Sequence, residues 1–314
     1  MPSDRQSLNP GTRLNGYVVQ SLLARGGFSL VYLATEEDGA DEVILKELVP
    51  KRIAARAEND AVVPREPKYT EDILRARRLF FQEAKALASL RHPNIVVIRD
   101  FFLANNTGYL VMQYEQGRNL GSYVHERGGK LSATFIFDVF APVLDALALL
   151  HSRSMLHLDV KPGNIHLRHG DYPILLDLGA VHPLSRGRTR GGQVITAGYS
   201  PVEQYYRGGH IGPWSDVYAV GASIRTCIEG KAPPSALDRR TQDTLIPAKH
   251  QFRKRYPLIL LEAIDWAMEM DPTKRPKDAG DLLRALNRYA DEIPGSKLTG
   301  SASQPYSSID RDRH

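Results

Sequence analysis

Four polar side chains that could bind a metal ion and phosphate lie close together in the segments HLDVKPGNIHL and ILLDLGA: Asp159, Lys161, Asn164 and Asp177. Carboxylate and amide oxygens are hard ligands that suit Mg²⁺, which also keeps waters and substrate phosphates. Asp159 and Lys161 place a base beside a cation, an arrangement that can orient a hydroxyl group toward phosphorus. A polar Pro-Gly turn would explain the first segment but not the second acidic turn, so the pattern favours a functional site.

Two further charged residues are predicted to be at least partly buried. Lys46 stands at the centre of the apolar strand VILKEL, and Glu83 lies between Phe80 and Leu87 on the apolar face of a later helix. A buried charge without a partner is costly, so each side chain needs one. The two could form a structural ion pair, or the lysine could be held in place to bind phosphate oxygens. These residues alone leave both interpretations open.

Two other patterns have a structural and a functional interpretation. Gly26 and Gly27 lie between two strand-like runs, where backbone N–H groups could cover a phosphate or simply form a hairpin turn. Glu203 and Arg275, each beside a proline-containing turn, could pair across the second half of the chain. Asp216, at the predicted start of a helix, could be its N-cap.

The elements that must position these residues change in type along the chain. Hydrophobic periodicity predicts strands over 17–22, 30–34, 43–48, 95–102 and 109–114, with a helix over about 70–90. Beyond Gly117 it predicts helices starting at Ser132, Asp216, Pro257 and Asp278, the second ended by Gly230. We therefore expect a polar leader over 1–15, a sheet-rich lobe over 16–113 with an insert at about 50–68, a helical lobe over 114–293, and a disordered tail over 294–314.

The composition excludes several classes of protein. The 314 residues are 25% charged and 42% hydrophobic with a net charge of +5, as in an ordinary globular protein. The sequence contains no basic stripe with interleaved aromatic residues, so nucleic-acid binding is not expected. The single cysteine, Cys227, falls in an apolar helix and is predicted to be buried and inert. The apolar stretch Val139 to Leu150 is shorter than the about 20 residues that span a bilayer. We expect no membrane span and a cytoplasmic location.

In their order along the chain, these motifs resemble those of the eukaryotic-type serine/threonine protein kinases, and HLDVKPGN and GYSPVEQY are similar to those of soluble bacterial members. The resemblance runs from about Tyr17 to Tyr289. It implies an α+β, bilobal protein-kinase fold, with a five-stranded sheet plus one helix in the N-lobe and a larger helical C-lobe. It also implies ATP and Mg²⁺ as cofactors, with Mn²⁺ as a possible substitute, and protein substrates that carry Ser or Thr.

The resemblance assigns a role to each candidate residue. The residues implied to contact the nucleotide are Ala24, Gly26, Gly27 and Val31 of the glycine-rich loop, Lys46 with its helix partner Glu83, and Met112, Gln113 and Tyr114 at the adenine pocket and hinge. The residues implied in catalysis and metal binding are the catalytic base Asp159, the γ-phosphate contact Lys161, and the Mg²⁺ ligands Asn164 and Asp177. The residues implied in the activation segment and its support are Thr189, Thr196, Glu203 and Arg275.

Some positions depart from the kinase pattern. Ala24 and Ser29 replace two glycines of the loop, and Leu158 stands where many kinases carry an arginine before the catalytic aspartate. That arginine is a cation which a phosphorylated activation loop neutralises, so we expect activity without phosphorylation through that route. Thr189 lies among three arginines that could bind its phosphate or attract an acidic substrate. The insert at 50–68 is predicted to be a loop or a hairpin. It could be a small docking or regulatory element over the helix, but a tolerated surface loop is the expectation.

Two alternatives to an active protein kinase remain. One is a nucleotide-binding pseudokinase that acts as a scaffold, although all five positions at which pseudokinases usually fail are intact here: Lys46, Glu83, Asp159, Asn164 and Asp177. The other is a small-molecule kinase on the same fold, although such enzymes generally lack the activation segment and the Glu203–Arg275 brace. The sequence does not predict the substrate, the upstream signal or the oligomeric state.

Overall fold

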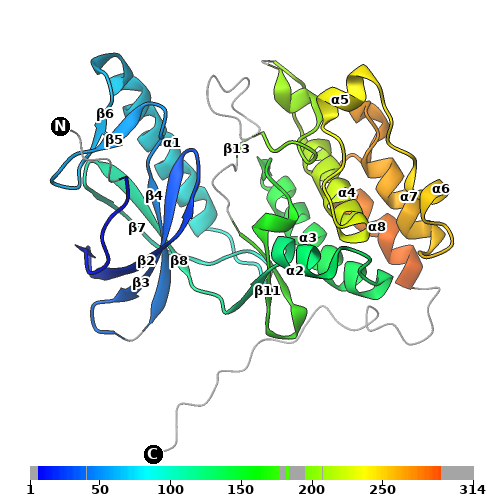
Figure 1. Cartoon of the computed structure of the whole chain (residues 1–314), viewed down its shortest axis with the longest axis horizontal. Coiled ribbons are helices and arrows are strands. Elements are labelled where there is room, and N and C mark those ends of the chain that lie inside the picture. The colour runs from blue at the N-terminus through cyan, green and yellow to red at the C-terminus, as the bar shows by residue number, and fades with distance from the viewer. Residues whose placement is uncertain (1–5, 40, 177–181, 184–194, 207, 291–314) are drawn as a thin grey trace, which may run out of the picture.

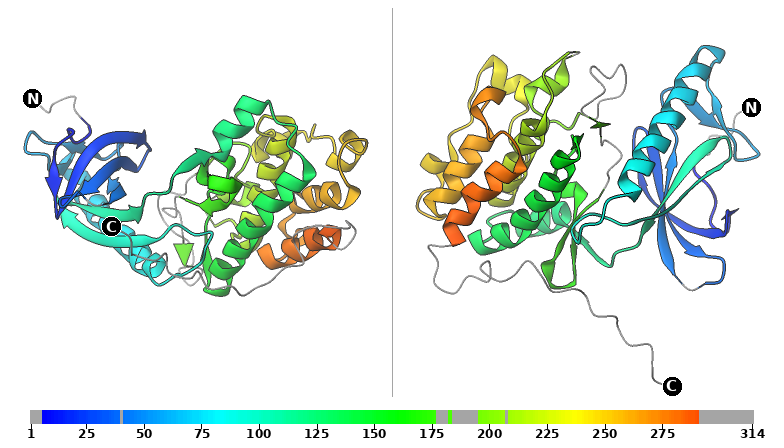
Figure 2. Two further views of the ribbon diagram at one scale, coloured as in Figure 1. Left: turned by 90° about the horizontal axis from the view of Figure 1, so that it is seen from below. Right: turned by 180° about the vertical axis from the view of Figure 1, so that it is seen from behind.

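The computed structural model describes residues 6–39, 41–176, 182–183, 195–206 and 208–290, which form two lobes joined by a short connection (Figure 1). Two candidate site residues, Asp177 and Thr189, lie outside the described residues, and so does the predicted tail over 294–314. Figure 2 shows the same two lobes from below and from behind.

The N-lobe is built on an antiparallel sheet with the strand order β1-β2-β3-β4-β8-β7. Its strands are β1 (Arg13–Leu14), β2 (Tyr17–Arg25), β3 (Ser29–Glu36), β4 (Glu42–Leu48), β7 (Ile98–Ala104) and β8 (Thr107–Gln113). The five predicted strands are confirmed, and the short β1 adds a sixth from the segment expected to be a polar leader. The predicted helix is α1 (Thr70–Ala88), which packs against β7 and β8.

Alternate residues of the sheet face two different hydrophobic cores, as the period-two geometry of strands requires. Leu110 and Met112 of β8 join α1 and the C-lobe in the larger core, while Tyr109 and Val111 join the smaller one. The smaller core also buries Leu8 and residues of the insert.

The insert is a folded part of this lobe. It forms a hairpin of β5 (Ala54–Arg56) and β6 (Val62–Pro64), followed by a 3-10 turn η1 (Pro67–Tyr69) that leads directly into α1. Ala54, Arg56 and Val62 are buried. The predicted hairpin is therefore confirmed, but the expectation of a tolerated surface loop was wrong, because the hairpin supplies side chains to the smaller core.

The C-lobe is mainly helical. Its helices are α2 (Leu120–Arg127), α3 (Ala133–Ser152), α4 (Pro213–Glu229), α5 (Ala236–Thr241), α6 (Ala248–Gln251), α7 (Leu258–Ala267) and α8 (Ala279–Ala290). Its short strands are β9 (Gly117–Asn119), β10 (Met155–Leu156), β11 (Ile165–Arg168), β12 (Pro173–Leu175) and β13 (His182–Pro183), and its 3-10 turns are η2 (Pro162–Asn164), η3 (His169–Asp171), η5 (Val202–Tyr205) and η6 (Pro272–Lys274). Ser132 caps α3 by accepting a hydrogen bond from the N–H of Phe135, and Gly230 ends α4 with φ 78°, as predicted.

Among the described residues, α3 is the one helix that is both long and apolar enough to cross a membrane, by length and composition alone. It packs instead against α4, α8, β10 and β12, and nine of its buried side chains belong to the larger core. A buried helix of this kind is typical of the centre of a lobe. Cys227 of α4 is also fully buried, and burial raises the pKa of its thiol, in agreement with the predicted inert cysteine.

The connection between the lobes ends at a glycine that no other residue could replace without strain. Gly117 has φ 155°, and a Cβ atom there would overlap the carbonyl oxygen of Leu167 and come within 2.7 Å of Nε2 of His166. The pairing of β9 with β11 therefore brings the backbone of the connection onto the strand that follows Asn164.

Candidate active site

The carboxylate of Asp159 is held by three donors at the opening of the C-lobe. Nζ of Lys161 lies 2.8 Å from Oδ2, the hydroxyl of Thr196 donates to Oδ1 at 2.7 Å, and Nδ2 of Asn164 donates to Oδ2 at 2.9 Å. Nζ of Lys161 also donates to Oγ1 of Thr196 at 3.2 Å. Asp159 is buried, while the side chain of Lys161 is 26% exposed. The result is a fixed carboxylate beside a cation that solvent can reach.

Asp216 holds the backbone of the loop that carries Asp159. The carboxylate of Asp216 accepts hydrogen bonds from the backbone N–H groups of His157 at 2.9 Å and of Leu158 at 2.7 Å. Leu158 adopts φ 59°, a conformation that costs free energy in a non-glycine residue and that these bonds stabilise. The interpretation of Asp216 as an N-cap was wrong: α4 begins at Pro213, its N-cap is Gly212, and Asp216 lies within the first turn.

A histidine completes the environment of Asp216. Nδ1 of His151 accepts a hydrogen bond from the N–H of Ala279 at 3.3 Å, so Nε2 carries the proton and donates to Asp216 at 2.9 Å. Burial acts to raise the pKa of Asp216, but the hydrogen bonds from His151 and from the N–H of His157 outweigh it and hold the pKa below its ordinary value. Helices α3, α4 and α8 thus meet at one buried carboxylate.

The predicted pair of Glu203 and Arg275 is present in the structure. Nη1 of Arg275 donates to Oε1 of Glu203 at 2.7 Å, and both side chains are almost fully buried. The hydroxyl of Ser215 also donates to Oε1 at 2.8 Å. This contact ties the segment after Thr196 to α4 and to the turn before α8.

The predicted nucleotide-binding residues of the N-lobe lie along the sheet. Lys46 is buried on β4, paired in register with Val31 of β3 and Leu110 of β8. Ala24 is exposed near the end of β2, and Gly26 and Gly27 are exposed in the β2–β3 turn, which is closed by a hydrogen bond from the N–H of Gly26 to the carbonyl of Ser29. Glu83 is half-buried on α1, and its pairing with Lys46 stays a prediction.

The residues predicted to contact adenine lie at the end of β8 and in the connection between the lobes. Met112 is buried at the end of β8, and Gln113 and Tyr114 are half-buried where the chain leaves the sheet. His166, a residue not expected from the sequence to lie at the site, lies against this connection beside Gly117. Burial lowers the pKa of His166, while the backbone and charge of Glu115 act in the opposite direction. The only signal for His166 in the sequence was a polar residue between the apolar residues Ile165 and Leu167.

The described residues suit a divalent cation bound together with phosphates. Because Nδ2 of Asn164 donates to Asp159, the amide oxygen is the atom of Asn164 that can bind a cation. Its predicted companion, Asp177, is outside the described residues. Within the described ranges no group of three His, Cys, Asp or Glu side chains is placed to hold a metal ion by itself. A site with only Asn164 and the predicted ligand Asp177 matches the preference of Mg²⁺ for few protein ligands together with substrate phosphates.

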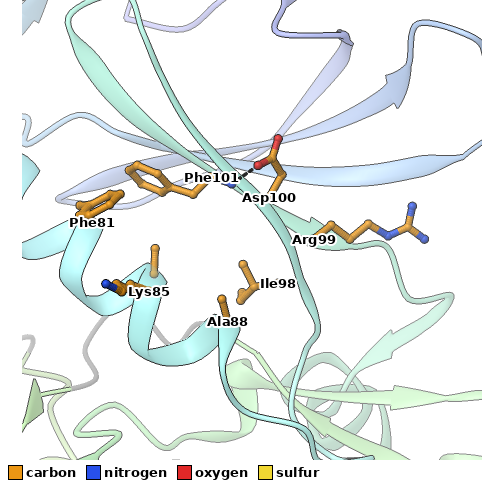
Figure 3. A pocket seen from close by; sticks show the side chains of 8 residues that line it. Phe81, Lys85, Ala88, Ile98, Arg99, Asp100 and Phe101 are labelled. Carbon is orange, nitrogen blue, oxygen red and sulfur yellow. Dashed lines mark hydrogen bonds between the residues drawn. The ribbon is translucent and has the colours of Figure 1, made fainter.

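A separate shallow pocket of about 320 Å³ lies between α1 and β7 (Figure 3). Phe81, Lys85, Ile98 and Phe101 are among its lining residues, and none of the lining residues is a predicted site residue. This pocket is therefore distinct from the Asp159 cluster.

Comparison with known proteins identifies the family of the chain. Residues 17–287 match the profile of the protein kinase domain. The chain is 29% identical to serine/threonine-protein kinase C of Synechocystis over 90% of its length, 28% identical to PrkC of Bacillus subtilis over 87%, and 30% identical to PknL of Mycobacterium tuberculosis over 88%. These alignments cover 51%, 40% and 66% of the relatives, so the chain spans about half the length of the curated relatives it matches.

A solved structure, the apo form of PpkA-294, is similar with a TM-score of 0.78 and 28% sequence identity, over 90% of this chain and all of that chain. The fold expected from the sequence, a bilobal kinase with a sheet-based N-lobe and a larger helical C-lobe, is confirmed. Because the profile covers most of the sequence, the chain belongs to the protein kinase domain family.

Proposed function

We propose that this chain is a serine/threonine protein kinase that transfers the γ-phosphoryl group of ATP to hydroxyl groups of proteins, including its own. The observation that supports this best is the Asp159 carboxylate held by Lys161, Thr196 and Asn164. The relatives named above are serine/threonine-protein kinases, which favours the same reaction here.

In the proposed mechanism, Asp159 would accept the proton of the substrate hydroxyl while the hydroxyl oxygen bonds to the γ-phosphorus; the bond from that phosphorus to the bridging oxygen breaks, and ADP is the leaving group. Lys161 holds the carboxylate in place and presents its positive charge where negative charge develops on the transferred group. The Thr196 hydroxyl fixes Oδ1 of Asp159 and so orients the second oxygen relative to the incoming substrate. All three act by position and charge, which is how most phosphoryl-transfer catalysis is achieved.

The cofactors proposed are ATP and Mg²⁺, with Mn²⁺ as a substitute. Lys46 would contact the α- and β-phosphates, and Asn164 and Asp177 would hold the metal ion. Mg²⁺ and ATP, when bound, supply the phosphoryl group and neutralise charge on its oxygens. The β2–β3 turn with Gly26 and Gly27 would lie over the phosphates, since its exposed backbone can approach them closely.

A protein substrate is favoured over a small molecule by the Glu203–Arg275 pair. This buried pair anchors the segment after Thr196, on which a polypeptide substrate would lie. A small-molecule kinase has no need of such a platform, and a pseudokinase has no need of an oriented carboxylate at Asp159.

The first prediction tests the proposed base. Asp159→Asn keeps the shape of the side chain but removes the basic oxygen, so we expect autophosphorylation and phosphorylation of a mixed protein substrate to fall by about 10²–10⁴-fold. Binding of Mg²⁺·ATP, measured by titration calorimetry, should persist. The matched control is Glu262→Gln, which makes the same chemical change at an exposed position of α7 and should keep full activity.

Three results would contradict the proposal. If the unaltered chain binds Mg²⁺·ATP but transfers no labelled phosphate, it is a scaffold. If it phosphorylates only a small alcohol, it is a small-molecule kinase. If Asp159→Asn keeps full activity, Asp159 is not the base.

A further inference from the structure

The interior of the N-lobe contains a charged cluster that plays no part in the proposed reaction. Glu47, the residue after Lys46 on β4, is fully buried and belongs to the face of the sheet that meets the smaller core. Its carboxylate accepts hydrogen bonds from the hydroxyls of Tyr32 at 2.8 Å and Tyr109 at 2.5 Å, and it pairs with Arg56 at 2.5 Å. These groups join β3, β4 and β8 to the hairpin of the insert.

The protonation states in this cluster are fixed by its surroundings. Burial raises the pKa of both tyrosines, so they remain donors at neutral pH. Burial acts to lower the pKa of Arg56, and the facing charge of Glu47 outweighs this effect. The cluster therefore contains an ion pair with no net charge, formed by Glu47 and Arg56 and surrounded by hydrogen bonds. Loss of either charge would leave the other buried without its counter-ion.

Arg56 connects three separate segments of the chain with one guanidinium group. Nη2 donates to Glu47 on β4, Nη1 donates to the carbonyl of Asp60 in the hairpin turn at 2.7 Å, and Nε donates to the carbonyl of Gln6 at 3.1 Å. A planar fork with several fixed donors suits this geometry better than a lysine would. The insert is thereby tied to both the sheet and the N-terminal segment.

The same insert contacts two parts of the predicted nucleotide site. The N–H of Lys51 donates to the carbonyl of Gly27 in the predicted glycine-rich loop at 3.0 Å. At its other end the insert continues through η1 into α1, and Ile73 of α1 packs in the smaller core with residues of the hairpin. Figure 1 shows β5 and β6 beside the N-terminal end of α1. Because the hairpin is continuous with α1, contacts that fix the hairpin also fix the N-terminal end of the helix that carries Glu83.

We propose that Arg56 is a positioning residue for phosphoryl transfer, which holds the insert on the sheet and thereby keeps α1 and the glycine-rich loop in the active arrangement. The inference rests on the proposed function, because kinases need the lysine of this strand and the glutamate of this helix in place together. Many kinases stabilise that arrangement by phosphorylating the activation loop. Here Leu158 replaces the arginine that binds the phosphorylated loop in those kinases. The buried contact between Arg56 and Glu47 in the N-lobe stabilises the active arrangement instead.

The test compares Arg56→Met with Arg52→Met, a matched change at an exposed arginine of the same insert. Activity is measured at a temperature where circular dichroism shows each variant fully folded. We expect Arg56→Met to lower kcat/KM for ATP by about tenfold or more and to speed amide hydrogen exchange in α1. Arg52→Met should change neither, and Arg56→Lys, which restores a cation near Glu47, should recover part of the loss.

A purely structural role would lower the melting temperature of Arg56→Met and leave kcat/KM and exchange in α1 unchanged, and that result would overturn the inference. If Arg56→Met does not fold, Tyr109→Phe replaces it in the test, because it removes one hydrogen-bond donor to Glu47 with little change in volume. The same two quantities are then measured, kcat/KM for ATP and amide hydrogen exchange in α1. If the unaltered chain shows no kinase activity, the proposed function fails, whereas hydrogen exchange in α1 still reports whether Arg56 holds the helix.

Discussion

The hydroxyl of Thr196 contacts both charged groups of the proposed catalytic pair, Asp159 and Lys161. From the sequence, Thr196 is expected in a substrate-docking loop, but its hydrogen bond to the carboxylate is seen only in the fold. Its two contacts connect residues separated by more than thirty positions, which only the folded chain brings together. They also give Thr196 a role that does not depend on its phosphorylation.

Replacing Thr196 by valine keeps the shape and removes the hydroxyl. A hydrogen bond to a charged group is worth about 1.5–3 kcal/mol, so we expect kcat to fall by roughly 10–150-fold, while serine keeps most of the activity. Steady-state kinetics with a protein substrate would measure this. Treatment of the unaltered chain with a phosphatase should leave its activity intact, and a loss of activity there would show that phosphorylation is required after all.

At the scale of helices and strands, local signals predicted the elements well. The cap at Ser132, the stop at Gly230 and the strand around Lys46 all follow from neighbours within a few residues, and all are present. Asp216 was misinterpreted for the same reason: a local pattern suggested a cap, whereas its partners His157 and Leu158 lie almost sixty positions earlier. Short-range chemistry fixes where an element begins, but not which distant loop a buried side chain supports.

Helix α4 is therefore predicted to stabilise the loop that carries Asp159. Asp216→Ala leaves two buried N–H groups without an acceptor, at a cost of about 1–3 kcal/mol each in the free energy of unfolding. We expect urea denaturation to show this loss, together with reduced kcat in the folded fraction. Asp281→Ala, at a partly exposed carboxylate of α8 with hydrogen bonds of its own, is a milder comparison. Equal losses for the two variants would contradict a special role for Asp216.

At the scale of the whole molecule, the two lobes share the larger core, while the smaller core belongs to the N-lobe alone. The two-lobe division was predictable because helical and strand periodicities separate cleanly near Gly117. The second core was not, since Tyr32, Glu47, Arg56 and Tyr109 look like ordinary strand or surface residues until the fold joins them. The net charge of +5 gave no hint of this buried pair.

A ligand that contacts both lobes should stabilise the whole chain. We expect Mg²⁺·ATP at about 100 times its Kd to add roughly 2.7 kcal/mol to the free energy of unfolding and to raise Tm in a thermal melt. Removal of the metal with EDTA should abolish most of the shift, because the proposed site holds phosphates jointly with Mg²⁺. A shift that persists without the metal would contradict that part of the proposal.

The buried contact between Glu47 and Arg56 also has an evolutionary consequence. An intermediate that has lost one of these charges carries an uncompensated ion in the protein interior, so natural selection will seldom tolerate it. In related kinases we therefore expect the two positions to covary, with both charges retained or both replaced by apolar residues. Gln6 accepts the hydrogen bond from Arg56 through its backbone carbonyl, so this contact does not require a particular side chain at position 6.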